Sequence, residues 1–286
     1  MRTLRKVAEL RSALRPARLR ERSIGLVPTM GALHEGHLSL IRRAREECDV
    51  VVVSLFVNPA QFNEEADLDA YPRDERRDAA VAAQCGADLL FAPAVDEVYP
   101  DGFGTTVHVA GLTETLEGAH RGVAHFDGVA TVVTKLLNMV QPDVAYFGQK
   151  DAQQALVIRR LVRDLDLPVR VEVSPTVREP DGLALSSRNV HLQGADRERA
   201  LALRHALDAA EAAVAAGVLD AAAVEAAARD AMAPHDVEPE YLALVDPDTL
   251  APVQRIDRDV LVAVAARVGA TRLIDNTLIG PNGRHR

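Results

Sequence analysis

Two histidines three residues apart, His34 and His37, stand in the stretch TMGALHEGHLSL (29–40), where an apolar run gives way to a helical pattern. The run Ile24–Val27 predicts a buried strand, and the loop after the first strand of a parallel sheet lies at the edge where ligands bind. A helix that begins there favours phosphate through its free N–H groups and its dipole. Gly36 lets a ligand approach the backbone closely. Two imidazoles on one helical face can donate hydrogen bonds to phosphoryl oxygens.

Zinc and dinucleotide motifs fit the histidine pair less well. The spacing is three rather than the four of H-E-x-x-H, and no neighbouring cluster supplies further zinc ligands. The stretch GALHEG lacks the second glycine of G-x-G-x-x-G, and no G-x-x-x-x-G-K-[ST] motif occurs. A purely structural role, in which one histidine caps or packs, stays open for the pair taken alone.

Two further polar clusters suit a nucleotide. In FGQKD (147–151), again between an apolar run and a helical pattern, Lys150 can meet a phosphate and Asp151 can accept from a ribose hydroxyl. The stretch DGLALSSRN (181–189) offers two hydroxyls and a guanidinium for a polyphosphate. These three side chains are Ser186, Ser187 and Arg188. Each cluster alone reads as a cap or a polar loop, but the three together predict a nucleotide-phosphate site at one end of the sheet.

The elements that position these clusters alternate between strand and helix. Strands are predicted at 50–57, 87–91, 144–147 and 169–173, with a further one at 107–109. Helices are predicted at 38–47, 74–85, 128–140 and 152–165, and the Arg-rich N-terminus is predicted to form a surface helix. This alternation predicts an α/β fold with a Rossmann-like, doubly wound parallel sheet over residues 1–175.

After about residue 176 the pattern changes to helices followed by strands. Ala-rich helices are predicted at 196–216 and 220–233, and strands at 241–245, 260–264 and 271–274. We expect residues 176–286 to form a smaller C-terminal α+β lid domain. Because clustered polar motifs are lacking there, we expect this domain to carry nothing essential beyond the 181–189 loop.

Bulk composition excludes several classes. The 286 residues carry a net charge of −9, which argues against nucleic acid as the main partner. The two cysteines, Cys48 and Cys85, are too few for a disulfide framework. The N-terminus has no apolar core of a secretory signal, and no apolar run approaches the about 20 residues that span a bilayer. We therefore expect a cytoplasmic protein without membrane partners.

Five motifs in order resemble the pantothenate synthetase (pantoate–β-alanine ligase) family. They are PTMGALHEGH, SLFVNPAQF (54–62), AYPR (70–73), FGQKDAQQ (147–154) and DGLALSSRN (181–189). H-x-G-H alone marks the wider nucleotidyltransferase superfamily, whereas FVNPAQF and DGLALSSRN after it are specific to this family. The resemblance runs from the first strand to the C-terminal strands.

The resemblance implies a reaction. The carboxylate of (R)-pantoate attacks the α-phosphate of ATP and releases pyrophosphate, and β-alanine then attacks the bound pantoyl adenylate to give pantothenate and AMP. It also implies Mg²⁺ with the ATP and a homodimer. No covalent enzyme intermediate is needed. Another H-x-G-H adenylyltransferase, or a non-catalytic nucleotide sensor, is the alternative.

The resemblance also assigns residues. The implied catalytic residues are His37, as proton donor, with His34, Lys150 and Arg188. The implied ATP-binding residues are Met30, Gly31, His34, His37, Gly148, Gln149, Lys150, Asp151, Val177 (through its backbone), Leu185, Ser186, Ser187 and Arg188. The implied pantoate- and β-alanine-binding residues are Asn58, Gln61, Arg121, His125 and Gln154.

Three positions depart from the family pattern. Gln149 stands where the family usually has glutamate, and the usual R-P-x-H-F is replaced by Arg121–Phe126, without the proline and with one more residue. Some members bind Mg²⁺ near the helix after the tyrosine motif, where this chain has Arg76 and Arg77. Mg²⁺ is therefore expected to be held chiefly by the triphosphate, with no protein ligand assigned.

Overall fold

A computed structural model describes residues 1–62 and 65–282. The chain forms two compact units, Met1–Gly148 with Gln153–Pro175, and Gln149–Ala152 with the chain from Thr176 onward. The turn at 149–152, which the sequence pattern placed in the first domain, groups with the second unit, where the side chain of Asn276 binds it. Within the two described ranges, no helix is both long and apolar enough to cross a membrane.

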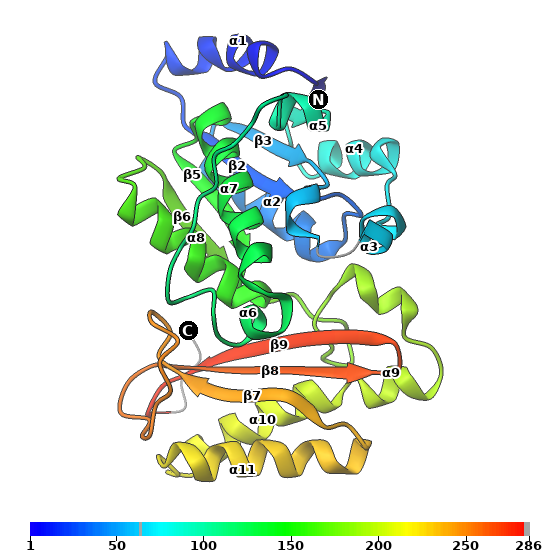
Figure 1. Cartoon of the computed structure of the whole chain (residues 1–286), viewed down its shortest axis with the longest axis vertical. Coiled ribbons are helices and arrows are strands. Elements are labelled where there is room, and N and C mark those ends of the chain that lie inside the picture. Colours follow the sequence, from blue (N-terminus) through cyan, green and yellow to red (C-terminus); the bar gives the residue numbers. More distant parts are fainter. Residues whose placement is uncertain (63–64, 283–286) are drawn as a thin grey trace. The chain divides into compact units, whose positions relative to one another are not determined.

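The first unit is built on a parallel sheet, as predicted (Figure 1). Its described strands follow the order β1-β4-β3-β2-β5-β6. They are β1 (Arg2–Leu4), β2 (Ile24–Thr29), β3 (Val50–Leu55), β4 (Leu89–Phe91), β5 (Val144–Gly148) and β6 (Arg170–Ser174). Val51, Val52 and Val53 are fully buried, as expected of a central strand covered on both faces. The edge strand β1 was not predicted, because three residues carry too little periodicity to be recognised.

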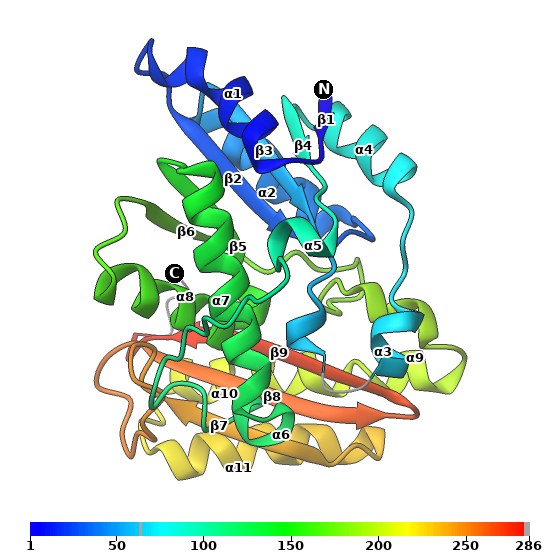
Figure 2. The same ribbon diagram turned by 45° about the horizontal axis from the view of Figure 1, so that its top comes forward.

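Helices cover both faces of this sheet. The described helices of this unit are α1 (Val7–Arg18), α2 (Glu35–Glu47), α3 (Glu65–Ala70), α4 (Glu75–Gln84), α5 (Val95–Val98), α6 (Glu117–Arg121), α7 (Val123–Val140) and α8 (Ala152–Asp164), with the 3₁₀ turn η1 (Pro59–Gln61). On one face, Ile41 of α2 and Ala82 of α4 pack with Val51 and Val53 in one buried cluster. Strand residues alternate between faces, so Val52 points to the other side. There α7 contacts β2 and α1, and Figure 2 shows α1 and α7 on the same side of the sheet.

The second unit is a three-stranded antiparallel sheet covered by two helices (Figure 1). Its elements are η2 (Gln149–Asp151), η3 (Ser187–His191), α9 (Ala195–Arg199), α10 (Ala202–Ala215), α11 (Ala221–Met232), η4 (Ala233–His235), β7 (Pro239–Val245), β8 (Val260–Val268) and β9 (Thr271–Ile279). Buried side chains such as Leu207 of α10, Val224 of α11 and Val262 of β8 form its core. Alanines let α10 and α11 lie against each other, which explains the Ala-rich composition.

Two predicted elements differ in the structure. Residues 107–109 form no strand, and the N–H of Val107 instead donates to Oγ1 of Thr131 at 2.9 Å. The helix predicted at 196–216 is divided into α9 and α10. At the division the N–H of Leu201 bonds the carbonyl three residues back, at Glu198, so the chain tightens into a 3₁₀ turn there.

Candidate active site

The two strands that precede the first two polar motifs are neighbours in the sheet. β2 lies between β3 and β5, so the strand order reverses at the β2–β5 boundary, and ligands of such sheets bind at the carboxyl ends of the strands there. The chain leaves β2 through the loop that leads to His34 and His37. β5 ends at Gly148, and the Gln149–Asp151 turn continues directly from it.

The histidine pair forms the N-terminus of α2. His34 is the N-cap residue, and its Nδ1 accepts from the N–H of Gly36 at 3.2 Å. Nδ1 of His37 accepts from the N–H of His34 at 3.4 Å, and the two ring centroids are 4.1 Å apart. Each neutral ring therefore carries its proton on Nε2, which is the atom with which it can donate to a phosphoryl oxygen. Capping and ligand binding use different nitrogens, so they are compatible.

A buried carboxylate holds the loop before the histidines. Asp78 of α4 is 1% exposed, and its two oxygens accept from the N–H groups of Ala32 at 2.8 Å and Leu33 at 2.9 Å. Gly31 and Ala32 both have positive φ, at +90° and +51°. For Ala32 that conformation is unfavourable, and the pair of charge-assisted hydrogen bonds stabilises it. Asp78 thus fixes the path by which the chain reaches His34.

The predicted pantoate-binding residues of η1 form one polar cluster. Nε2 of Gln61 donates to Sδ of Met30 at 3.0 Å, and Nδ2 of Asn58 donates to Oε1 of Gln61 at 3.1 Å. Nδ1 of His125, on α7, lies 2.7 Å from the carbonyl oxygen of Gln61. The structure therefore brings Met30, Asn58, Gln61 and His125 together.

Asn58 is the buried anchor of this cluster. It is fully buried; its Oδ1 accepts a hydrogen bond from the hydroxyl of Tyr99 at 2.7 Å, and its Nδ2 donates to the carbonyl of Gly128 at 3.1 Å. Burial raises the pKa of Tyr99 to about 12, so its hydroxyl stays a donor at neutral pH. Asn58 accordingly fixes η1, and Gln61, which is half-buried, is the more accessible amide.

Two other predicted pantoate residues lie in different surroundings. Nε of Arg121 forms an ion pair with the buried carboxylate of Glu117 at 2.8 Å. Gln154 is half-buried on α8, whereas its neighbour Gln153 is buried and binds the carbonyls of Leu112 and Thr115. Gln153 is therefore structural, and Gln154 is the glutamine of that pair suited to a ligand.

In the second unit, the phosphate-binding candidates lie on two short turns. The Lys150 side chain is 19% exposed, and its Nζ is 3.8 Å from Oδ1 of Asp151. Ser186 is the N-cap residue of η3, and its Oγ accepts from the N–H of Arg188 at 3.3 Å. Arg188 is exposed and Ser187 is half-buried. The N–H of Leu185 donates to the carbonyl of Val177 at 3.0 Å, so these two residues face each other where the two arms of a hairpin begin and end.

The described residues contain no group of three or more His, Cys, Asp or Glu side chains placed to hold a metal ion. Mg²⁺ is commonly bound through one or two carboxylates and the phosphates of a substrate, so this finding is compatible with a metal that arrives with ATP.

Sequence reasoning missed Asp78 and Asn276. Asp78 was hidden among the charges of ERRD, although it lies four residues before Ala82 on the buried stripe of α4. A carboxylate on an apolar stripe was the available signal. For Asn276 the signal was weaker, namely two polar residues in the middle of a strand, at 275 and 276, which are 3% and 5% exposed.

A parallel sheet with H-x-G-H at the helix N-terminus beside its switch point defines the class of H-x-G-H nucleotidyltransferases. The chain belongs to the pantoate-beta-alanine ligase family, whose profile matches residues 2–278.

Relatives named pantothenate synthetase are similar in sequence over nearly the whole length of this chain. The chain is 53% identical to the pantothenate synthetase of Moorella thermoacetica, covering 99% of this chain and 100% of that protein. It is 54% identical to that of Agrobacterium fabrum, covering 98% and 96%.

Solved structures agree as well. The crystal structure of pantothenate synthetase from Thermus thermophilus is similar with a TM-score of 0.90 at 50% identity, covering 96% of this chain and 98% of that one. The pantoate-beta-alanine ligase of Francisella tularensis, complexed with beta-gamma ATP and beta-alanine, has a TM-score of 0.79 at 35% identity, covering 98% and 99%.

Proposed function

We infer that this protein is an AMP-forming ligase that condenses (R)-pantoate with β-alanine to give pantothenate. The observation that carries this conclusion is the family match over residues 2–278, together with the H-x-G-H helix start at the switch point. A carboxylate oxygen of pantoate attacks the α-phosphorus of ATP, and the bond from that phosphorus to the bridging oxygen breaks as pyrophosphate leaves. The β-alanine amine, after losing a proton, attacks the acyl carbon; the bond from that carbon to the phosphate oxygen breaks, AMP leaves, and the nitrogen loses a second proton as the amide forms.

His34 and His37 are proposed to stabilise the phosphates during adenylation. Negative charge builds up on the α-phosphoryl oxygens and on the departing pyrophosphate. Donors fixed beforehand at the positions of that charge lower the barrier. The Nε2–H groups of both rings, together with the dipole of α2, supply such donors, and His37 is assigned as the proton donor.

ATP is proposed to be held by residues of the three polar motifs. Lys150 supplies a point charge for phosphate, and Arg188 a guanidinium that can bind two oxygens at once. The remaining proposed ATP contacts are Met30, Gly31, Gly148, Gln149, Asp151, Val177, Leu185, Ser186 and Ser187.

Pantoate and β-alanine are proposed to bind at the η1 cluster. Gln61 and Gln154 can bind the hydroxyls and carboxylate of pantoate, and His125 and Asn58 keep Gln61 in place. Arg121 is included by family resemblance, and its guanidinium is partly committed to Glu117.

Mg²⁺ is proposed to enter with ATP, bound to the phosphate oxygens. The described residues offer no cluster that could hold the ion alone, so no step is assigned to it.

We also propose a homodimer in the cytoplasm. Both suggestions rest on the family resemblance, and the cytoplasmic location also on the free cysteines at 48 and 85. Light scattering after gel filtration tests the assembly, since a dimer doubles the chain mass of 30.9 kDa.

The decisive experiment is pantoate-dependent exchange of labelled pyrophosphate into ATP without β-alanine. We expect exchange in the wild type and a loss of about 100-fold or more in His37→Ala, the scale seen when a transition-state donor is removed. The matched control is His108→Ala, because His108 is an exposed histidine paired with Asp127 and has no assigned role. A wild type that binds ATP but shows no pantoate-dependent exchange would refute the function.

A further inference from the structure

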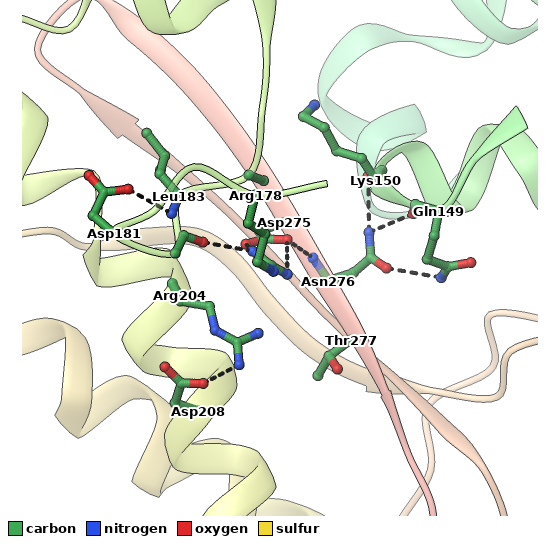
Figure 3. A network of polar contacts seen from close by, with 12 residues as sticks. Gln149, Lys150, Arg178, Asp181, Leu183, Arg204, Asp208, Asp275, Asn276 and Thr277 are labelled. Atoms are coloured by element: carbon green, nitrogen blue, oxygen red, sulfur yellow. Dashed lines mark hydrogen bonds and ion pairs between the residues drawn. The ribbon is translucent and has the colours of Figure 1, made fainter. Parts of the chain in front are cut away.

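An asparagine of the C-terminal strand binds the turn that carries Lys150. Asn276 is 5% exposed, and its Nδ2 donates to the carbonyl oxygens of Gln149 at 3.0 Å and Lys150 at 2.9 Å. Its Oδ1 accepts from Nε2 of Gln149 at 3.0 Å. Figure 3 shows all three bonds converging on one carboxamide. Among the described residues β9 is the edge strand of its sheet, and the turn η2 lies against that edge.

The chemistry of this contact requires an amide at position 276. Two carbonyl oxygens can only accept, so the side chain facing them needs two N–H donors, which Asn has and Asp lacks. The two carbonyls therefore fix which side of the Asn276 amide carries the nitrogen, and the amide oxygen faces Nε2 of Gln149. Gln149 can donate to that oxygen, whereas the glutamate usual in the family could not.

The preceding residue of β9, Asp275, binds the hairpin at 177–185, which leads to the phosphate-binding candidates Ser186, Ser187 and Arg188. Asp275 is 3% exposed and forms a two-pronged ion pair with Arg178, at 2.6 and 3.0 Å. The same guanidinium donates to the carbonyl of Gly182 at 3.1 Å, inside the hairpin that leads to Ser186. Oδ1 of Asp275 also accepts from the N–H of Asn276 at 2.8 Å, so the two residues are bonded to each other (Figure 3).

We propose that Asn276 is a positioning residue for Lys150 in adenylation, and that Asp275 fixes the 177–185 hairpin to the same point of β9. The proposal rests on the proposed function. Asn276 touches no substrate; it acts by setting where the Lys150 backbone, and therefore its ammonium group, stands. The C-terminal strand thus contributes to ATP chemistry, contrary to the expectation that only the 181–189 loop of this domain does.

The test is a double-mutant cycle between Asn276→Asp and Lys150→Ala in pantoate-dependent exchange. Asn276→Asp keeps the shape but places a carboxylate against two carbonyl oxygens. We expect it to lower kcat/KM for ATP by at least about tenfold, since small misplacements of a reacting group are costly. In the Lys150→Ala background the same change should cost less than about threefold, because the group it positions is gone.

The matched control is Thr277→Val, the next residue of β9. It loses the 2.8 Å hydrogen bond from Thr277 to Glu211 of α10, whereas the side-chain hydrogen bonds to the carbonyls of Gln149 and Lys150 come from Asn276 and are kept. We expect Thr277→Val to lower the thermal stability, as Asn276→Asp does, but to leave kcat/KM for ATP unchanged. Equal losses of activity from Asn276→Asp with and without Lys150, or wild-type activity in Asn276→Asp, would overturn the proposal.

Two safeguards keep the result decisive. If Asn276→Asp does not fold, the same cycle is run with Asn276→Ala, which removes the three bonds without burying a charge. If the wild type shows no exchange, the proposed function fails, but positioning is still measured by the rise in Tm on adding ATP. That rise should shrink in the Asn276 variant, whereas in the Lys150→Ala background the same Asn276 change should shrink it little further. A full ATP-dependent rise in the Asn276 variant contradicts the proposal.

Discussion

At the scale of single residues, Asp78 shows how a buried charge can serve a site that it does not enter. Asp78→Asn keeps the volume, but the amide nitrogen cannot accept from the N–H of Ala32 or Leu33. We expect the free energy of unfolding to fall by about 1–3 kcal/mol, the cost of leaving a buried donor unpaired. Pyrophosphate exchange should fall as well, because the loop before His34 loses its support. Urea unfolding and exchange assays measure the two effects.

The control for Asp78 is the residue that caps the same helix. Asp74 caps α4 by accepting from the N–H of Arg77 at 2.9 Å, so Asp74→Ala should lower stability by about 1 kcal/mol. Exchange by the folded Asp74→Ala protein should stay at the wild-type level. If both variants lose exchange in proportion to stability, Asp78 supports only the fold.

These residues also mark what the sequence could and could not predict. His34, His37, Asn58 and Gln61 stood out because their types and local spacing are unusual. Asp78 acts on a loop 46 residues earlier, and Asn276 on a turn 126 to 127 residues earlier. Local patterns carry no information about such pairings, which arise only when the strands and helices pack.

At the scale of elements, the prediction succeeded for most of the periodic stretches. The core strands and α2, α4, α7 and α8 were expected, and the doubly wound sheet is confirmed. The strand predicted at 107–109 is wrong, because these residues have no regular secondary structure. The prediction was also wrong at 196–216, where i to i+3 hydrogen bonds divide one periodic stretch into α9 and α10. Periodicity indicates burial, and local hydrogen bonding decides the conformation.

One helix-to-turn contact depends on a single glycine. A Cβ on Gly128 of α7 would lie 2.2 Å from the carbonyl oxygen of Ala60 in η1, so Gly128→Ala must push η1 away. We expect a loss of about 1–3 kcal/mol in stability, as for other overpacked sites. Because Gln61 belongs to η1, KM for pantoate should rise by about tenfold or more while ATP-dependent thermal protection is kept.

Gly104→Ala is the control for this helix-to-turn contact, since an added methyl group there meets no atom nearer than 3.9 Å. Urea unfolding and initial rates of pantothenate formation at varied pantoate compare the two. Unchanged stability and KM in Gly128→Ala would show that η1 moves without consequence.

At the scale of the whole molecule, carboxylates in both units have folded-state pKa values below their ordinary ones. The Arg170 side chain lowers the pKa of Glu47, backbone N–H donation lowers the pKa of Asp49 and Glu97, and the N–H of Asp248 does so for Asp246. A depressed folded pKa means that the unfolded chain takes up protons first as the pH falls. The stability from these groups is therefore complete above their ordinary pKa values of 3.8 to 4.5, and is lost as the pH falls through the lower folded values.

We accordingly expect the free energy of unfolding to be flat from about pH 7 to 5 and to fall steeply below about pH 4.5. Urea titrations followed by circular dichroism at a series of pH values measure this slope. Asp246→Asn is the informative variant, because its amide oxygen can still accept from the turn at Asp248 and Thr249 but does not titrate. It should be less stable than the wild type near neutrality and lose less stability on acidification. Equal stability at about pH 7 and pH 3.5 in the wild type would mean that these ion pairs and hydrogen bonds do not favour the charged carboxylates in the folded protein.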